Sequence, residues 1–252
     1  MRSFALRGFL VLSGFCLGMG LAMTSAVQAE ELVAEEPAQE QHGLPLLFRE
    51  DFQSGNLSRW EMSDPKAWKV VPHRKNFVLY QFTQSMNKPT FRSPYNRALI
   101  KDLVVSDCVL DVRLQSTGAN VDHRDMCLFF GYQDPEHFYY VHLGKKADKY
   151  ANQIFIVDGA DRKKISLEST SGTPWNDNWH HARVVRKASD GMILVYFDSM
   201  DQPVMKALDK SFDRGQVGLG SFDDTGYFDN ILVYGVKALP SPKKRLTIPG
   251  NR

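Results

Sequence analysis

The amino-acid sequence predicts an all-β fold, a two-sheet antiparallel β-sandwich of the jelly-roll type. Short runs rich in β-branched and aromatic residues recur at regular spacing between residues 46 and 235. Turn-forming residues separate these runs, and no long segment carries the apolar period of a helix. Many short strands at such spacing are typical of sandwiches and barrels.

The first half of the domain contains the clearest single strand. Between Asp107 and Gln115 the apolar residues alternate with polar ones, which include Asp111 and Arg113. A period of two marks a strand that is buried on one face. The strands predicted before it are residues 47–52, 68–71 and 77–80.

The second half of the domain contains two clear hairpins. Residues 126–132 and 138–143 are joined by a segment with the composition of a turn. Residues 154–157 and 164–167 flank an Asp-Gly-Ala-Asp turn. The remaining predicted strands are residues 180–186, 192–197, 216–219 and 227–234. Because the first and last strands are both strongly apolar, we expect them to lie side by side in one sheet.

Residues 1–29 have the pattern of an export signal. Arg2 and Arg7 precede an uncharged, apolar stretch that reaches about Met23, and Val27–Ala29 offers the small residues of a cleavage site. The sequence therefore predicts a periplasmic or extracellular protein with no membrane span after cleavage. The alternative is an uncleaved anchor, because the uncharged stretch approaches the length that spans a bilayer.

Two charged segments flank the predicted domain, residues 45–236. Residues 30–44 are acidic and predict a flexible linker, and residues 237–252 predict a basic, proline-rich, disordered tail. Removing the signal takes away two of 31 basic residues and none of 29 acidic ones, which leaves a net charge of zero. Acidic and basic residues are scattered along the chain, so the sequence does not predict a nucleic-acid-binding protein.

Cys108 and Cys127 are the two cysteines that follow the predicted signal. Exported proteins can form disulfides. A hairpin centred on Gly118 would bring the two strands together, and a bridge would need both side chains on one face. Two buried free thiols are the alternative, and the residues leave both open.

Four stretches together carry a resemblance to a known family: Arg49–Phe52 with Trp60, Phe130–Leu143, Trp179–Asp198 and Gly215–Ile231. In this order they resemble the concanavalin A-like lectin/glucanase superfamily. Laminin-G-like and 3-keto-disaccharide-hydrolase-like domains of exported bacterial proteins are the most similar. The resemblance implies the jelly-roll fold but no single activity, because binding modules, glycosidases and lyases share that fold.

The resemblance also implies one structural Ca²⁺ between the first and last strands. Glu50, Asp51 and Asp229 are the predicted carboxylate ligands, and calcium takes six to eight oxygen ligands. The alternative is that these acids are solvated or paired with Arg or Lys. The sequence shows no zinc pattern, because His180 and His181 are adjacent on one strand and no Cys-x-x-Cys occurs.

A glycan or oligosaccharide is the predicted ligand, bound on the concave sheet. Aromatic rings stack on sugars, and carboxylate, amide and guanidinium groups hold the hydroxyls, as in other ligand sites with a few placed polar groups. The candidate binding residues are Asp111, Arg113, Tyr140, His142, Asn152 and Trp175. The alternative for each is structural: Tyr140 packs, Asp111 pairs with Arg113, and Trp175 shields the core.

Catalysis is a second hypothesis. A retaining glycosidase would show two carboxylates on one strand face, about 5 Å apart, and the sequence has no such pattern. A hydrolase would instead use His142 as acid or base, oriented by Asp125 or Asp148. A third hypothesis is a laminin-G-like interaction domain with an envelope protein as partner.

Overall fold

The computed structural model of the protein describes residues 36–241, and its compact unit begins at Ala38. The predicted export signal and the part of the predicted tail from residue 242 onward lie outside the described residues. No helix within residues 36–241 is long and apolar enough to cross a membrane. The elements in chain order are β1 (Glu40–Gln41), β2 (Leu44–Glu50), β3 (Trp60–Met62), a 3₁₀ helix (Pro65–Ala67), β4 (Trp68–His73), β5 (Asn76–Gln81), β6 (Asn96–Ser116), β7 (Asp125–Asp134), β8 (His137–Gly144), β9 (Gln153–Asp158), β10 (Lys163–Lys164), β11 (Ser166–Ser169), β12 (His180–Lys187), β13 (Met192–Phe197), β14 (Met205–Leu208), β15 (Gly215–Ser221) and β16 (Gly226–Lys237).

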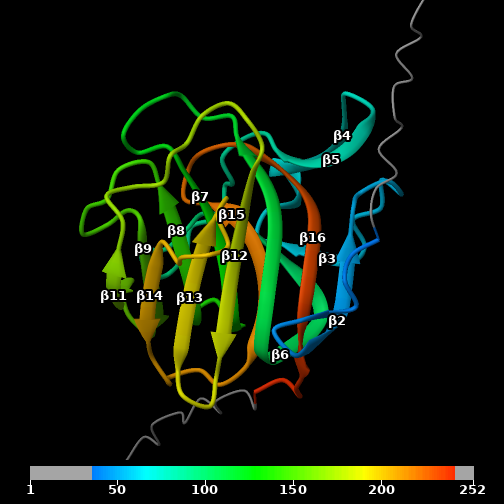
Figure 1. Ribbon diagram of the computed structural model, residues 1–252. Coiled ribbons are helices and arrows are strands. Elements are labelled where there is room, and N and C mark those ends of the chain that lie inside the picture. Colours follow the sequence, from blue (N-terminus) through cyan, green and yellow to red (C-terminus); the bar gives the residue numbers. More distant parts are fainter. Residues whose placement is uncertain (1–35, 242–252) are drawn as a thin grey trace, which may run out of the picture. The chain divides into compact units, whose positions relative to one another are not determined.

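The strands form two antiparallel layers that share the long strand β6. In the first layer β10, β9, β8, β7 and β15 follow one another, and the first part of β6 pairs with β15 and β3. In the second layer β11, β14, β13 and β12 lead to the second part of β6, which also pairs with β16. β16 pairs in turn with β2 and β5. Figure 1 shows the yellow strands β12 and β13 in front of the green strands β7 and β8. The predicted all-β antiparallel sandwich is therefore confirmed.

Alternation along the strands fills the space between the layers. The central apolar cluster takes every second residue of β6 from Cys108 to Leu114, together with Leu128 of the first layer and Val184 of the second. Each large apolar side chain that is fully buried stabilises the fold by roughly 1.5–3 kcal/mol. The outer faces carry two further apolar clusters, one on β7, β8 and β9 and one on β6, β12, β13 and β16.

The two ends of the domain meet in one sheet, as predicted. Phe48 of β2 lies opposite Val233 of β16, and Glu50 lies opposite Ile231. Both strands place apolar side chains in the central cluster, and this shared burial holds the ends together.

The first hairpin begins inside the segment predicted as an acidic linker, residues 30–44, and its second strand continues beyond it. Glu40 and Gln41 of β1 pair with Leu44 and Pro45 of β2. The two turn residues, His42 and Gly43, have φ values of 53° and 74°. Positive φ at both central positions is the conformation of a two-residue hairpin turn that matches the twist of the strands. An acidic composition does not prevent this pairing.

Cys108 and Cys127 are both free and buried. The predicted hairpin around Gly118 does not form, because β15 lies between β6 and β7. Cys108 packs in the central cluster, whereas Cys127 packs in the cluster on the outer face of the first layer. The free-thiol alternative is therefore the one that the structure has.

Candidate functional site

A polar pocket lies at the end of the β7–β8 pair on the outer face of the first layer. Its volume is about 180 Å³. Loops that precede β6, follow β8, precede β10 and follow β15 complete its wall. The lining residues are Arg92, His123, Asp125, His142, Asp148, Tyr150, Ala151, Arg162, Phe222 and Asp223. This pocket brings together all three residues that were predicted as acid–base candidates, His142, Asp125 and Asp148.

The strand pair β7–β8 sets the geometry of the pocket floor. Cys127 of β7 lies directly opposite His142 of β8. Asp125 comes two residues before Cys127, and successive side chains of a strand alternate between its faces, so these three side chains share the outer face. The residues on either side of Cys127, Met126 and Leu128, point into the central cluster. Local alternation therefore places Asp125 and Cys127 on one face, and the β7–β8 register adds His142 beside them.

His142 is held by its backbone neighbour and faces a carboxylate. Its Nδ1 donates a hydrogen bond to the carbonyl oxygen of Tyr150 at 2.9 Å. Its Nε2 lies 3.2 Å from Oδ2 of Asp125. Burial by itself would lower the pKa of His142. The charge of Asp125, its hydrogen bond and the hydrogen bond to Tyr150 together outweigh burial, and the pKa is raised.

Asp125 is fixed from both of its ends. Its Oδ1 accepts a hydrogen bond from the backbone N–H of Phe222 at 2.9 Å, and its own N–H donates to Oδ2 of Asp224 at 2.6 Å. Burial, and then the negative charge of Asp125, raise the pKa of Asp224 to about 6. The same two causes raise the pKa of Asp223, which lines the pocket. The floor of the pocket is therefore a concentration of acidic groups.

Guanidinium groups and aromatic rings also line the pocket. Nη1 of Arg162 donates to the hydroxyl of Tyr140 at 3.0 Å, and the guanidinium lies 4.5 Å from the ring centre of Phe222. The guanidinium of Arg92 lies 5.5 Å from the ring centre of Tyr150. Sequence reasoning missed both arginines. They follow no motif, and each sits on a loop that only the fold brings to the pocket.

Three of the predicted ligand residues have structural roles. Tyr140 is fully buried and its ring is stacked on Phe155 at 5.2 Å. The amide of Asn152 is buried, where its Nδ2 donates to the carbonyl oxygen of Thr170 and its Oδ1 accepts from Thr173. The third, Trp175, belongs to the central cluster. For these residues the packing alternative is what the structure shows.

Asp111 and Arg113 do not share a surface with Tyr140 and His142, so the predicted single binding face is wrong. Both residues lie on the second part of β6, whose neighbours are β12 and β16, whereas β8 belongs to the first layer. The outer faces of the two layers point in opposite directions. Asp111 pairs with Arg183 at 2.7 Å rather than with Arg113, which is exposed.

The predicted calcium ligands lie near the β2–β16 pair, and each already has protein partners. Glu50 lies 3.3 Å from Nη1 of Arg59, and Oδ2 of Asp229 accepts from Nδ2 of Asn76 at 2.5 Å. Burial, with the charges of Asp51 and Glu50, raises the pKa of Asp229 to about 6. The ligand oxygens of the three acids do not all lie within 4.8 Å of one another. In this arrangement they do not form one coordination sphere.

The calcium site stays a prediction, and it requires these carboxylates to move together. If Ca²⁺ binds there, millimolar Ca²⁺ is expected to raise the Tm of the wild type, because a ligand that binds the folded state stabilises it by mass action. EDTA should reverse the rise, and Asp229→Asn should abolish it. Differential scanning calorimetry checks this, and a Tm that Ca²⁺ and EDTA leave unchanged contradicts the prediction.

Comparisons with known proteins show likeness of fold. No family model matches the chain, and no curated protein matches its sequence significantly. The carbohydrate-binding module CBM66 from Bacillus subtilis is similar, with TM-score 0.50 and 17% identity over 70% of this chain and 96% of that one. Domain 4 of AbnA, a GH43 extracellular arabinanase from Geobacillus stearothermophilus solved with arabinotriose, has TM-score 0.51 and 10% identity over 77% of this chain and 94% of that one.

A third similar structure is a larger protein. The GH43 protein BlXynB from Bacillus licheniformis has TM-score 0.54 and 10% identity, over 74% of this chain and 39% of that one. At such identities the likeness extends to the fold alone. The chain shares with these structures a jelly-roll β-sandwich fold.

Proposed function

We propose that this domain binds a carbohydrate in the pocket at the end of β7 and β8. The observation that carries the proposal is the chemistry of the lining. Arg92, Arg162 and Asp223 offer charged hydrogen-bonding groups, and Tyr150 and Phe222 offer aromatic faces. A pocket of convergent polar groups beside aromatic rings is suited to a sugar, whose ring has both hydroxyls and apolar C–H faces.

The size of the pocket favours one sugar unit at the end of a chain. Its volume of about 180 Å³ is below the ~300–1,000 Å³ typical of sites for drug-sized ligands. An oligosaccharide bound along its length would need a longer groove. A terminal unit can enter the pocket while the rest of the chain extends into solvent.

Two of the similar structures support a carbohydrate ligand. One is described as a carbohydrate-binding module and the other as a domain in complex with arabinotriose. This support comes from the shared fold.

The test compares two exposed arginines on opposite layers. Arg92→Ala removes a charged donor from the pocket, and Arg113→Ala is the matched control on the second layer. After a glycan array has identified a ligand, isothermal titration calorimetry should show a loss of about 10–100-fold in affinity for the first variant, the usual cost of a hydrogen bond to a charged group. The control should bind within about twofold of the wild type. Loss of binding in Arg113→Ala alone would move the site to the other layer.

Hydrolysis of a glycan is the second candidate function. The observation that favours it is the Asp125–His142 pair, which lines the same pocket as Asp148. Hydrolysis would be established if the wild type releases reducing sugar from the bound glycan and the His142→Gln variant does not. Tight binding without release, over long incubation, assigns the domain to binding.

A further inference from the structure

We infer that Asp125, Cys127 and His142 form a binding site for one Zn²⁺ ion, with an open coordination position toward the pocket. Asp125 and His142 line the pocket, so an ion held between them and Cys127 can be reached from it. The inference does not rest on the proposed carbohydrate binding, because the residues hold the ion whether or not a sugar enters.

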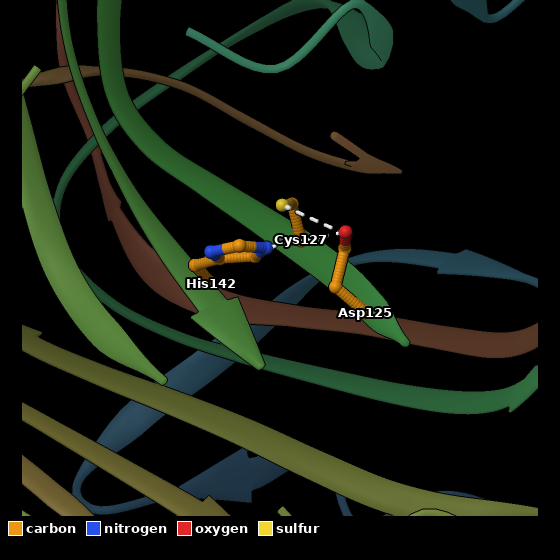
Figure 2. A group of neighbouring side chains, drawn as sticks. All are labelled: Asp125, Cys127 and His142. Carbon is orange, nitrogen blue, oxygen red and sulfur yellow. Dashed lines mark hydrogen bonds and ion pairs between the residues drawn. The ribbon is translucent and has the colours of Figure 1, made fainter. Parts of the chain in front are cut away.

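The first argument is convergence. One potential ligand atom from each residue lies within 4.8 Å of the other two. Among the described residues 36–241, this is the group of three or more His, Cys, Asp or Glu side chains whose ligand atoms lie so close together. Nε2 of His142 lies 3.2 Å from Oδ2 of Asp125, and Sγ of Cys127 lies 3.8 Å from Oδ1, the other oxygen of the same carboxylate. Zinc bonds of about 2.0–2.3 Å at tetrahedral angles place ligand atoms about 3.3–3.6 Å apart. Figure 2 shows the three side chains pointing toward one another from adjacent strands.

The second argument is the state of His142 Nε2. The side chain of His142 is 8% exposed, and Nε2 is a buried atom that makes no hydrogen bond of acceptable geometry, although Asp125 lies near it. The hydrogen bond to the carbonyl oxygen of Tyr150 keeps one ring proton on Nδ1, so the nitrogen that can offer a lone pair to a metal is Nε2. Any proton that Nε2 carries beside Asp125 is released to solvent when the ion binds. Buried polar atoms nearly always have a partner, and a metal ion supplies one here.

The outer contacts of the ligands also fit a metal site. Histidine ligands usually donate their second N–H to a carbonyl or carboxylate, which fixes the tautomer and the ring, and Tyr150 does this for His142. Ligating carboxylates are themselves hydrogen-bonded, and the N–H of Phe222 holds Oδ1 of Asp125. Oδ2 is left to face the ion. These supports exist in the structure without any ion bound.

The donor set selects the metal. A thiolate, an imidazole and a carboxylate are ligands of Zn²⁺, whereas Ca²⁺ and Mg²⁺ take oxygen ligands. Non-structural zinc sites have three protein ligands and leave the fourth position open to water or to a hydroxyl group of a bound molecule. Cys127 gives its thiol proton to solvent when the ion binds. The thiolate and the carboxylate then balance the charge of the ion beside Arg162.

The test titrates the full chain with metal in the absence of sugar. We expect one Zn²⁺ per chain by metal analysis after dialysis. With Co²⁺ in its place, we expect a thiolate charge-transfer band and the d–d bands of a tetrahedral ion. Loss of a residue that only hydrogen-bonds to a metal ligand usually costs about 10–100-fold in metal affinity. Cys127→Ser and His142→Gln each remove a ligand itself, so each should weaken Zn²⁺ binding by more than this. Cys108→Ser is the matched control, a buried free cysteine of the central cluster, and it should keep both the stoichiometry and the spectrum.

Three results would overturn the inference. They are a wild type that retains no zinc, a Co²⁺ spectrum that survives Cys127→Ser, and a spectrum that is lost in Cys108→Ser. If Cys127→Ser fails to fold by circular dichroism, X-ray absorption of the zinc-loaded wild type decides, because a site with Cys127 has one sulfur at about 2.3 Å. Sugar binding measured in EDTA is a separate experiment, so failure of either proposal leaves the other in place.

Discussion

Replacing Trp175 with alanine is expected to lower the free energy of unfolding by about 3–5 kcal/mol, the usual cost of truncating a buried aromatic residue. The side chain is 5% exposed and packs edge-on against Phe197 and His180, with ring centres 5.1 and 5.3 Å away. Its Nε1 donates to the carbonyl oxygen of Leu143 at 2.6 Å. The variant loses this packing and leaves that buried carbonyl without its donor. Urea unfolding followed by circular dichroism measures the change.

Trp179→Ala is the control for this experiment. Trp179 is half-buried and lies against Tyr227 and His73, outside the central cluster. We expect Trp179→Ala to lower the free energy of unfolding by about 1 kcal/mol, the centre of the range for point substitutions. Equal losses in the two variants would contradict the core role of Trp175. Lost sugar affinity in folded Trp175→Ala, with little lost stability, would return it to the ligand candidates.

Asp111→Ala is expected to lower the free energy of unfolding by about 3–5 kcal/mol, because it removes one member of a buried ion pair. Asp111 is 5% exposed and receives hydrogen bonds from Nε and Nη2 of Arg183 at 2.7 and 2.8 Å. Nε2 of His181 lies 3.0 Å from the same carboxylate. Without Asp111, the guanidinium of Arg183, whose side chain is 12% exposed, loses its bidentate partner. Glu168 is the control, because it forms an exposed ion pair with Lys206 at 2.8 Å. Glu168→Ala should lower the free energy of unfolding by at most about 1 kcal/mol.

The effect of Asp111→Ala should depend on pH with a defined sign. Burial by itself would raise the pKa of Asp111, but the hydrogen bonds from His181 and Arg183 outweigh it and the pKa is lowered. A carboxyl with a lowered pKa adds stability above its unfolded pKa of about 3.9, and this is lost as the pH falls through the folded pKa. The difference between wild type and variant should therefore be largest near neutral pH and shrink in acid. A difference that grows as the pH falls would contradict the pairing.

Local alternation determined much of the fold in advance. The half-buried face of residues 107–115 appears in β6, and the predicted hairpin of residues 126–132 and 138–143 is β7–β8. The strongly apolar first and last strands pair as β2 and β16. Each of these depends on the period of two and on turn residues, which act within a few positions along the chain.

The failures concern neighbours that are distant in sequence. Asp111 and Tyr140 both lie on outer faces, and the sequence could not say that β6 leaves the first layer before Asp111. The hairpin expected at Gly118 failed because β15 enters between β6 and β7. Pairing between distant strands depends on burial summed over whole sheets, and no short stretch of sequence contains that sum.

The residues 45–236 by themselves determined a sandwich with joined ends, and they supplied every polar group of the pocket. Only the tertiary structure decided which of those groups meet. Asp125 and Cys127 share a strand face by local alternation, but the β7–β8 register sets Cys127 opposite His142, and two loops distant in sequence bring Arg92 and Arg162 to the same place. A site depends on distances of a few ångströms between side chains, and those distances are set by packing across the whole domain.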